Sequence, residues 1–237
     1  MLLSVLTRMF EGNMDKVFVC LANSRKTSGR CIAGKETVGG KIGAWVRPIS
    51  EREHHEISEV DRRYDDGTTA QVFDIIGVKF KGKAAHPSQE ENYTIDDGFY
   101  WGNNGRFSGD LDDLLDTPNS LWQNGYFSYS GLNDRVSELL IVSPGQSLFF
   151  ISPDNFEIVV RVEGAEFGNG KKKVRARFHY NGVQHFISVT DPAVETIYLA
   201  QGEGVYKPKG RIYMTVSLGE PWDGYYYKLA AGIFEVK

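Results

Sequence analysis

The sequence predicts a mainly β protein made of two consecutive small barrels. Short runs rich in β-branched and aromatic residues recur along the chain, and turns containing glycine, asparagine or proline separate them. Residues 193–200 have a clear helix start, because Asp191 can cap the helix and Pro192 suits its first position. In the second half this short helix follows a series of strands and precedes two more, and the helix of an OB barrel lies between its third and fourth strands. That order is typical of an OB-like Greek-key barrel.

Composition limits the function classes. The 237 residues are enough for one large or two small domains, and the formal net charge is −4. Proteins that coat duplex DNA are usually basic, so any contact with nucleic acid must come from a local patch. No apolar run approaches the ~20 residues needed to cross a bilayer. Cys20 and Cys31 with scattered histidines do not make a metal site, so we expect a cytoplasmic protein without a membrane partner or cofactor.

The first half is predicted to hold an OB-like barrel over residues 15–135, after an N-terminal tail at 1–14. Extended segments are expected at residues 15–22, 31–34, 42–50 and 71–80. A polar loop at 23–30 follows the first of them, and the third is expected to stop at Pro48. Alternation puts Trp45 and Arg47 on one face of that third strand.

Two stretches of the first half lack a clear strand pattern. Residues 51–66 are strongly charged and predict a solvated loop or short helix, and the adjacent His54 and His55 point in different directions, which disfavours a metal site. Residues 84–135 mix aromatic and acidic residues with turns and are interpreted as a long insertion. A short helix at 110–116 is expected within them, ending before Pro118.

The second half predicts another OB-like barrel over residues 136–237. Its strands are expected at residues 148–151, 156–161, 173–180, 183–190, 211–216 and 225–236. Asn181-Gly182 indicates a two-residue hairpin turn with positive φ. Gly219, Pro221 and Gly224 are interpreted as a turn that neither flanking strand can absorb. The residues this turn would place at the tip of the last hairpin are Ser217, Glu220, Trp222 and Asp223.

Four stretches of the chain resemble the bacterial dual OB-containing domain family. They are residues 21–26 with 29–31, residues 45–50, residues 188–192 and residues 217–229, and the match extends over most of residues 15–236. The resemblance implies two consecutive OB folds and a role in handling nucleic acid, with a bacterial defence system against foreign DNA as one setting for that role. It implies no particular reaction.

Eleven residues are candidates for ligand binding. Cations and hydroxyls at residues 24–26 could hold a phosphate, and Trp45 with Arg47 could stack a base and follow the backbone. Residues 173–177 form a basic stripe on one strand face, and the last hairpin adds a carboxylate beside aromatic and basic groups. The equally simple alternatives are a solvated loop, a core tryptophan, an exposed hairpin arm and a well-packed hairpin. The candidates are Ser24, Arg25, Lys26, Trp45, Arg47, Lys173, Arg175, Arg177, Glu220, Tyr226 and Lys228.

The leading functional hypothesis is a nucleic-acid-binding module for single-stranded or modified DNA or RNA. One alternative is a sensor of a small nucleotide or modified base, and another is a protein-interaction module that docks through the aromatic hairpin. No nucleophile–base pair, glycine-rich phosphate loop or metal spacing accompanies the candidates, so catalysis is not expected. A basic groove carrying Trp45 would favour a polymer, and a closed hole lined by Glu220 and Tyr226 would favour a single small ligand.

Overall fold

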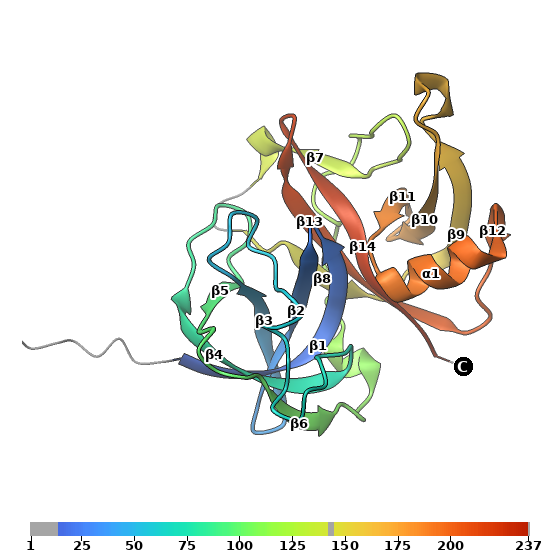
Figure 1. Ribbon diagram of the computed structural model, residues 1–237. Coiled ribbons are helices and arrows are strands. Elements are labelled where there is room, and N and C mark those ends of the chain that lie inside the picture. Colours follow the sequence, from blue (N-terminus) through green and yellow to red (C-terminus); the bar gives the residue numbers. More distant parts are fainter. Residues whose placement is uncertain (1–13, 142–144, 237) are drawn as a thin grey trace, which may run out of the picture.

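The first sheet closes on itself as a barrel (Figure 1). The computed structural model describes residues 14–141 and 145–236. The strands of this sheet are β1 (Met14–Lys26), β2 (Gly29–Val38), β3 (Lys41–Ile49), β4 (Asp74–Lys83), β5 (Asn92–Ile95) and β6 (Gly102–Arg106). They lie in the order β1-β2-β3-β5-β4-β6, and β1 also pairs with β4, which closes the ring. The β3–β5 pair is parallel, as the cyclic order of an OB barrel requires.

The second sheet repeats this cyclic order. Its strands are β7 (Arg135–Ser137), β8 (Leu148–Ile151), β9 (Asp154–Glu163), β10 (Lys171–Tyr180), β11 (Val183–Val189), β12 (Gly204–Tyr206), β13 (Arg211–Trp222) and β14 (Tyr225–Val236). The order is β12-β9-β10-β11-β14-β13-β8, with β7 beside β14. Since β8 runs almost directly into β9, the two act as one bent first strand that meets both β10 and β13. The β11–β14 pair is parallel.

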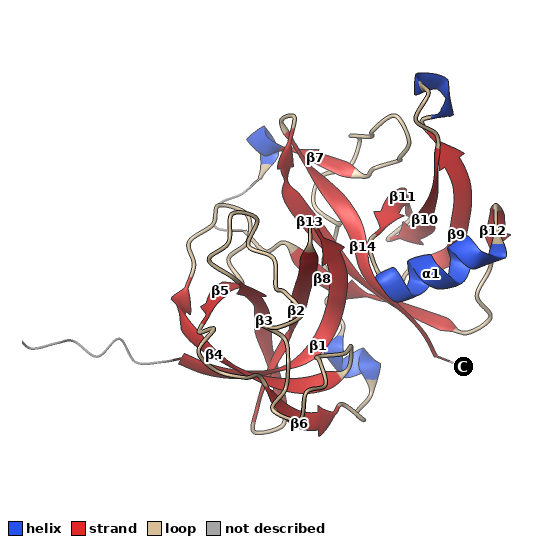
Figure 2. Cartoon of the chain, viewed as in Figure 1, coloured by secondary structure: helices blue, strands red, loops and turns tan. Residues whose placement is uncertain are grey.

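The mainly β prediction with a short helix in the second barrel is confirmed (Figure 2). Among the described residues, α1 (Pro192–Gln201) is the only α-helix, and the Asp191 side chain accepts hydrogen bonds from two backbone N–H groups at its start. The remaining helical turns are the 3-10 helices η1 (Leu111–Leu114), η2 (Glu138–Leu140) and η3 (Ala165–Phe167). Asn181 and Gly182 have φ values of 48° and 78°, as the predicted hairpin turn requires. No helix in the described part of the chain has the length and apolarity to cross a membrane.

Two local predictions in the first barrel are wrong. The predicted polar loop at 23–30 is mostly strand, because Arg25 pairs with Arg30 and Lys26 with Gly29, which leaves only a short turn between β1 and β2. The strand predicted to stop at Pro48 continues to Ile49. Proline is tolerated there because β2 pairs with β3 only as far as Val46, so no hydrogen bond to β2 is lost.

The last hairpin also differs from its prediction. β13 runs through Gly219 and Pro221 to Trp222, and a β-bulge between Leu218 and Pro221 absorbs the misfit. The turn itself is Asp223-Gly224, where φ is 51° and 77°. Ser217 therefore lies in the strand, where it is buried, and only Trp222 and Asp223 of the four predicted residues stand at the tip.

A shared apolar cluster joins the two barrels. Alternate residues of β1, β2 and β3 point into the first barrel, for example Phe18, Ile32 and Val46. The other face of these strands packs against β8, β13 and β14 of the second barrel. We call this cluster the seam; it includes Val19, Leu21, Ala33, Trp45, Leu148, Phe150, Tyr213 and Phe234. Because OB barrels bind ligands on the outer face of their second and third strands, most of that face in the first barrel is occupied by packing.

Residues 120–134 form a cover segment over one end of the second barrel. Leu121 belongs to the core of that barrel. Further along, Leu132 exchanges backbone hydrogen bonds with Phe186 of β11, and the Lys228 N–H of β14 donates to the Asp134 carbonyl at 2.8 Å. The segment thus fills the gap between β11 and β14 where these strands do not pair with each other.

Candidate binding site at the seam

A cavity of about 440 Å³ lies at one end of the seam, with walls from both barrels. We call it the seam pocket. Its volume falls within the range of small-molecule sites in proteins. The first barrel and its loops contribute Ser24, Arg25, Lys26, Thr27, Cys31, Arg47, Glu53, His54, His55 and Gln89. The second barrel contributes Ser217, Leu218, Gly219, Glu220, Leu229 and Ala231.

The two barrels are fixed to each other beside this pocket. At the end of β1, the Arg25 N–H donates to the Thr190 carbonyl at 2.8 Å, immediately before the helix of the second barrel. Ser24 pairs in register with Cys31 on β2, so their side chains emerge on the same face of the sheet. Opposite them, the bulged part of β13 brings Ser217 and Glu220 against the first barrel.

Arg47 is the deepest charged group of the pocket and is only 3% exposed. Its Nη2 donates to Ser147 Oγ at 2.8 Å and to Ser217 Oγ at 3.3 Å. The same nitrogen lies 3.3 Å from Glu91 Oε1, and the Ser147 hydroxyl donates to that carboxylate. A buried guanidinium is tolerable here because its Nη2 group is paired with two hydroxyls and a carboxylate.

The Arg47 Nε–H group has no hydrogen-bond partner among the described residues, although it is out of reach of solvent. Buried N–H groups without a partner are rare in folded proteins because each carries a desolvation cost of about 1–3 kcal/mol. Arg47 lines the seam pocket, so a small shift of its side chain on ligand binding would let an acceptor atom of a bound molecule reach this donor.

Charged groups at the pocket mouth are paired across the two barrels. Lys26 Nζ lies 3.1 Å from Glu220 Oε1, and His86 Nε2 lies 3.3 Å from Glu220 Oε2. Burial alone would raise the pKa of Glu220, but Lys26, His86 and Arg47 together hold that pKa below its usual value. Arg25, which is half exposed, makes a two-point contact with Glu195 of α1 at 3.2 and 2.9 Å. An anion entering the pocket would therefore compete with Glu220 for Lys26.

The rest of the wall is apolar or neutral. Leu229 and Ala231 of the second barrel line the same cavity as Cys31 of the first. Cys31 is a free, partly exposed cysteine. Apolar walls with a few convergent donors suit a flat heterocycle that carries polar atoms on its edge.

Five of the eleven predicted ligand-binding residues meet in this pocket: Ser24, Arg25, Lys26, Arg47 and Glu220. They come from β1, β3 and β13, so the folding of both barrels is needed to assemble them. The other six lie elsewhere.

Trp45 belongs to the seam core and is 5% exposed. Its indole Nε1 donates to Asp116 Oδ2 at 3.0 Å, and Lys35 Nζ lies 2.7 Å from the other oxygen of that carboxylate. With Lys35 and Tyr93 it borders a different cavity of about 350 Å³. Trp45 and Arg47 do share a strand face, but the second barrel packs over the Trp45 ring, which leaves it no free face on which a base could stack.

The predicted basic stripe on β10 is largely neutralised. Val174 and Ala176 point into the barrel, as the alternation predicted, and Lys173 is exposed. Arg175 is buried and makes a two-point contact with Glu163 at 2.6 and 2.9 Å. Arg177 pairs with Glu157 at 3.0 Å, which leaves Lys173 as the open cation of the three.

Tyr226 and Lys228 point into the second barrel, away from the seam pocket. Tyr226 packs with Val136 and Leu218. Lys228 is fully buried beneath the cover segment, where Nζ donates to the Gln123 carbonyl at 2.8 Å and to Asn124 Oδ1 at 3.3 Å. Burial lowers the pKa of Lys228 from 10.5 to about 7, against the attraction of Asp134.

Several pocket residues were not foreseen from the sequence. Gln89, His54 and His55 come from loops without periodicity, and Ser147, which holds Arg47, precedes β8. The part of the chain that the structure describes holds no group of three His, Cys, Asp or Glu side chains placed to bind a metal ion.

Comparison with known families agrees with the topology. The family model described as "Dual OB-containing domain" matches residues 16–233. The match covers nearly the whole chain, so this chain belongs to that family. No curated protein and no solved structure gives a significant match.

Proposed function

We propose that this dual-OB protein is a nucleic-acid-binding module whose seam pocket holds one nucleotide of a single strand. OB barrels commonly bind oligonucleotides or oligosaccharides, and the family match makes two such barrels the frame of the molecule. One observation carries the choice of site: the buried Arg47 donor that lacks a partner.

Pocket size and lining favour one nucleotide unit. A nucleobase would lie among the apolar lining residues Leu229, Ala231 and Cys31. An acceptor atom on the edge of the base would accept a hydrogen bond from the Arg47 Nε–H group. The phosphate would stay at the mouth, near Lys26 and Arg25, where cations can follow a backbone without reading sequence.

The observed seam argues against a strand lying across the whole face of the first barrel. The outer faces of β2 and β3 are packed against the second barrel, and Trp45 is part of that packing. The geometry therefore supports a single inserted nucleotide better than several bases stacked in a row along the seam.

A free nucleotide or modified base is the second candidate ligand. The enclosure of the pocket by both barrels favours it, because a detached small molecule needs no exit path for a continuing strand. Strand length separates the two candidates. A nucleic-acid module gains affinity when the nucleotide is extended by neighbours, whereas a nucleotide sensor does not.

The test is direct binding by the full chain. Nucleoside monophosphates and labelled DNA and RNA single strands of increasing length are titrated by fluorescence anisotropy and thermal shift, at about 50 mM and about 200 mM salt. Arg47→Lys keeps the charge but removes the Nε–H donor, so we expect about tenfold weaker binding, as for loss of one charged hydrogen bond. Arg211→Lys, an exposed arginine paired with Asp112 far from the pocket, is the matched control.

Two results would contradict this proposal. Absence of binding to every nucleotide and strand at the lower salt concentration overturns the proposed function. Equal affinities for Arg47→Lys and the unchanged protein would leave binding intact but remove it from this pocket.

A further inference from the structure

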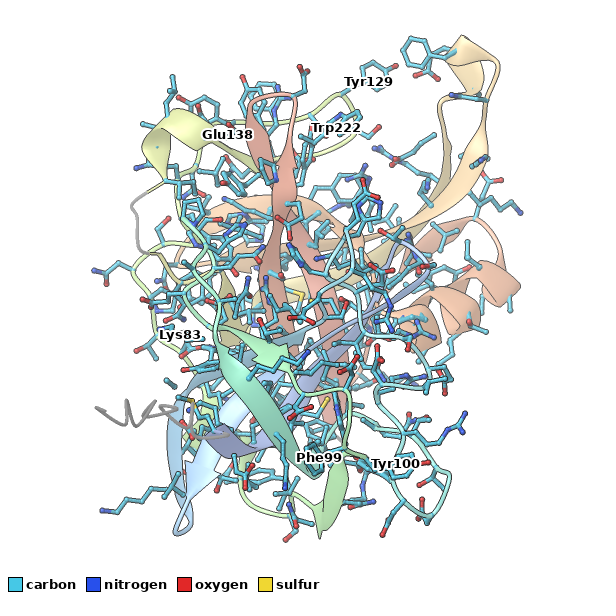
Figure 3. The ribbon with its side chains drawn as sticks, turned by 60° about the vertical axis from the view of Figure 1, so that its left-hand side comes forward. Lys83, Phe99, Tyr100, Tyr129, Glu138 and Trp222 are labelled. Atoms are coloured by element: carbon cyan, nitrogen blue, oxygen red, sulfur yellow. The ribbon has the colours of Figure 1, made fainter. Side chains whose placement is uncertain are left out.

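The tip of the second barrel carries large aromatic side chains that face solvent. Trp222 is 74% exposed, Tyr129 79% and Phe167 69%. Figure 3 shows Trp222 and Tyr129 at the same end of the molecule, opposite Phe99 and Tyr100. Single exposed rings are common on protein surfaces, but a group of them marks a contact site.

These rings form two groups, one at each of two hairpins, and the cover segment contributes one tyrosine to each group. At the β13–β14 turn, Trp222 pairs in register with Tyr225, and Tyr126 of the cover segment lies 6.2 Å from the Tyr225 ring. At the β9–β10 hairpin, Tyr129 of the same segment meets Phe167 edge to face at 5.6 Å. We call Trp222, Tyr225, Tyr126, Tyr129 and Phe167 the aromatic row.

Cations flank both ends of the row. The Arg135 guanidinium stacks on the Tyr225 ring at 3.9 Å, and its Nε is buried without a partner among the described residues. Directly after the hairpin that carries Phe167, β10 begins with three exposed lysines at 171–173. Within the described chain, neither Lys171 nor Lys173 forms an ion pair, so both charges are open to an anion.

Flat rings with free lysines at one end match one ligand class best. Bases stack on aromatic rings whatever their sequence, and lysines attract the phosphates between them. A protein partner would also accept the rings, but it would not by itself explain the two unpaired lysines that follow Phe167 at the start of β10.

We propose that the aromatic row is a stacking platform for successive bases of single-stranded DNA or RNA, with Lys171 and Lys173 against its backbone. The row is independent of the seam pocket. Trp222 nevertheless lies two residues beyond Glu220 along β13, about 7 Å at the usual rise of a strand. A strand with one nucleotide in the pocket could therefore continue onto the row.

The test uses the full chain and a labelled oligothymidylate of about ten nucleotides, long enough to cover several stacking sites. Trp222→Ala and Phe167→Ala should each weaken binding about tenfold. Tyr100→Ala removes a ring of similar exposure, 65%, at the opposite end and should change nothing. Because all three side chains are exposed, melting temperatures should stay close to that of the unchanged protein.

Two further readouts locate the strand. Trp45 and Trp101 are buried and Trp122 is half-buried, so quenching of tryptophan fluorescence by the oligonucleotide should come mainly from Trp222 and disappear in Trp222→Ala. Replacing Lys171 and Lys173 together by glutamine should make the salt dependence shallower by about 1.4 in the log–log slope, as for two lost phosphate contacts on a single strand.

Unchanged oligonucleotide affinity in both Trp222→Ala and Phe167→Ala overturns this proposal. The same result is expected if the row binds a protein and not a nucleic acid. The outcome is separable from that of the pocket. If Arg47→Lys weakens mononucleotide binding while the row variants bind the oligonucleotide normally, the pocket stands and the row falls. The reverse pattern keeps the row and removes the pocket.

Discussion

Arg47 of the first barrel and Ser217 of the second are 170 positions apart in the chain, yet Arg47 Nη2 donates to Ser217 Oγ at 3.3 Å. Both residues line the seam pocket. The pocket therefore exists only while the two barrels are docked, and a ligand held between them should stabilise that docking by mass action.

Ser217→Ala should separate the contribution of Arg47 to barrel docking from its contribution to ligand binding. The change removes one of the two serine acceptors of Nη2 and leaves Nε untouched, so we expect a loss of about 1 kcal/mol in the free energy of unfolding. Affinity for nucleotides should stay within about threefold, far less than the effect of losing a charged hydrogen bond. Urea denaturation and anisotropy titration measure the two quantities. A tenfold loss of affinity would show that the serine, and not the Nε–H donor, is what the ligand needs.

Glu220→Gln should strengthen binding of phosphate-bearing ligands by a factor of about 3 to 10. The Glu220 carboxylate forms an ion pair with Lys26 and repels an incoming anion. A neutral amide at position 220 removes both the ion pair and the repulsion. Asp65→Asn makes the same change in net charge on an exposed loop and is the control. Titrations at two salt concentrations check the result. Weaker binding in Glu220→Gln would mean that the carboxylate contacts the ligand, as a reader of base donors would.

Trp45→Ala should act on stability and not on ligand contact. Removing a buried tryptophan from the seam costs about 3–5 kcal/mol and also leaves Asp116 without its indole donor. Trp45→Phe keeps most of the packing, so this variant should fold and bind nucleotides like the unchanged protein. Calorimetric unfolding and anisotropy give the comparison. Selective loss of binding in a stably folded Trp45→Phe would restore the stacking role that the sequence suggested.

Lys228→Met should remove part of the pH dependence of stability. With a folded pKa of about 7 and an unfolded pKa near 10.5, Lys228 binds more protons in the unfolded chain between these values. The free energy of unfolding therefore rises with pH in that window, by up to about 1.4 kcal/mol per unit. Below pH 7 and above about 10.5 this contribution is flat.

Urea denaturation at several pH values between 7 and 10 measures the effect as a difference between Lys228→Met and the unchanged protein. The difference cancels contributions from other titrating groups, and any fixed cost of leaving the Gln123 carbonyl without a donor shifts the curve without changing its slope. If the free energy of unfolding rises with pH at the same slope in both proteins, the lowered pKa of buried Lys228 is contradicted.

Local patterns account for much of the fold. Asn181-Gly182 and Asp191-Pro192 each select one backbone conformation through their own chemistry, and both appear where expected. The β13 bulge was not predictable in this way, because pairing with β14 lets β13 absorb Gly219 and Pro221, which would break an isolated strand.

The candidate site was predictable only in part. Alternation placed Trp45 and Arg47 on the same face, but it carries no information about what packs on that face. The second barrel packs over Trp45, whereas Arg47 on the same strand face lines the seam pocket, so two positions of one face have different surroundings. Loop residues such as Gln89 reach the pocket through tertiary contacts that have no period in the sequence.

The rate at which iodoacetamide alkylates Cys31 in the full chain reports directly whether a nucleotide occupies the seam pocket. Cys31 is partly exposed and lines the seam pocket, whereas Cys20 is fully buried and serves as the internal control. If a nucleotide occupies the pocket, alkylation of Cys31 should slow in proportion to the bound fraction and saturate with the binding curve. Saturated binding with an unchanged rate of Cys31 alkylation would place the ligand elsewhere and contradict the claim.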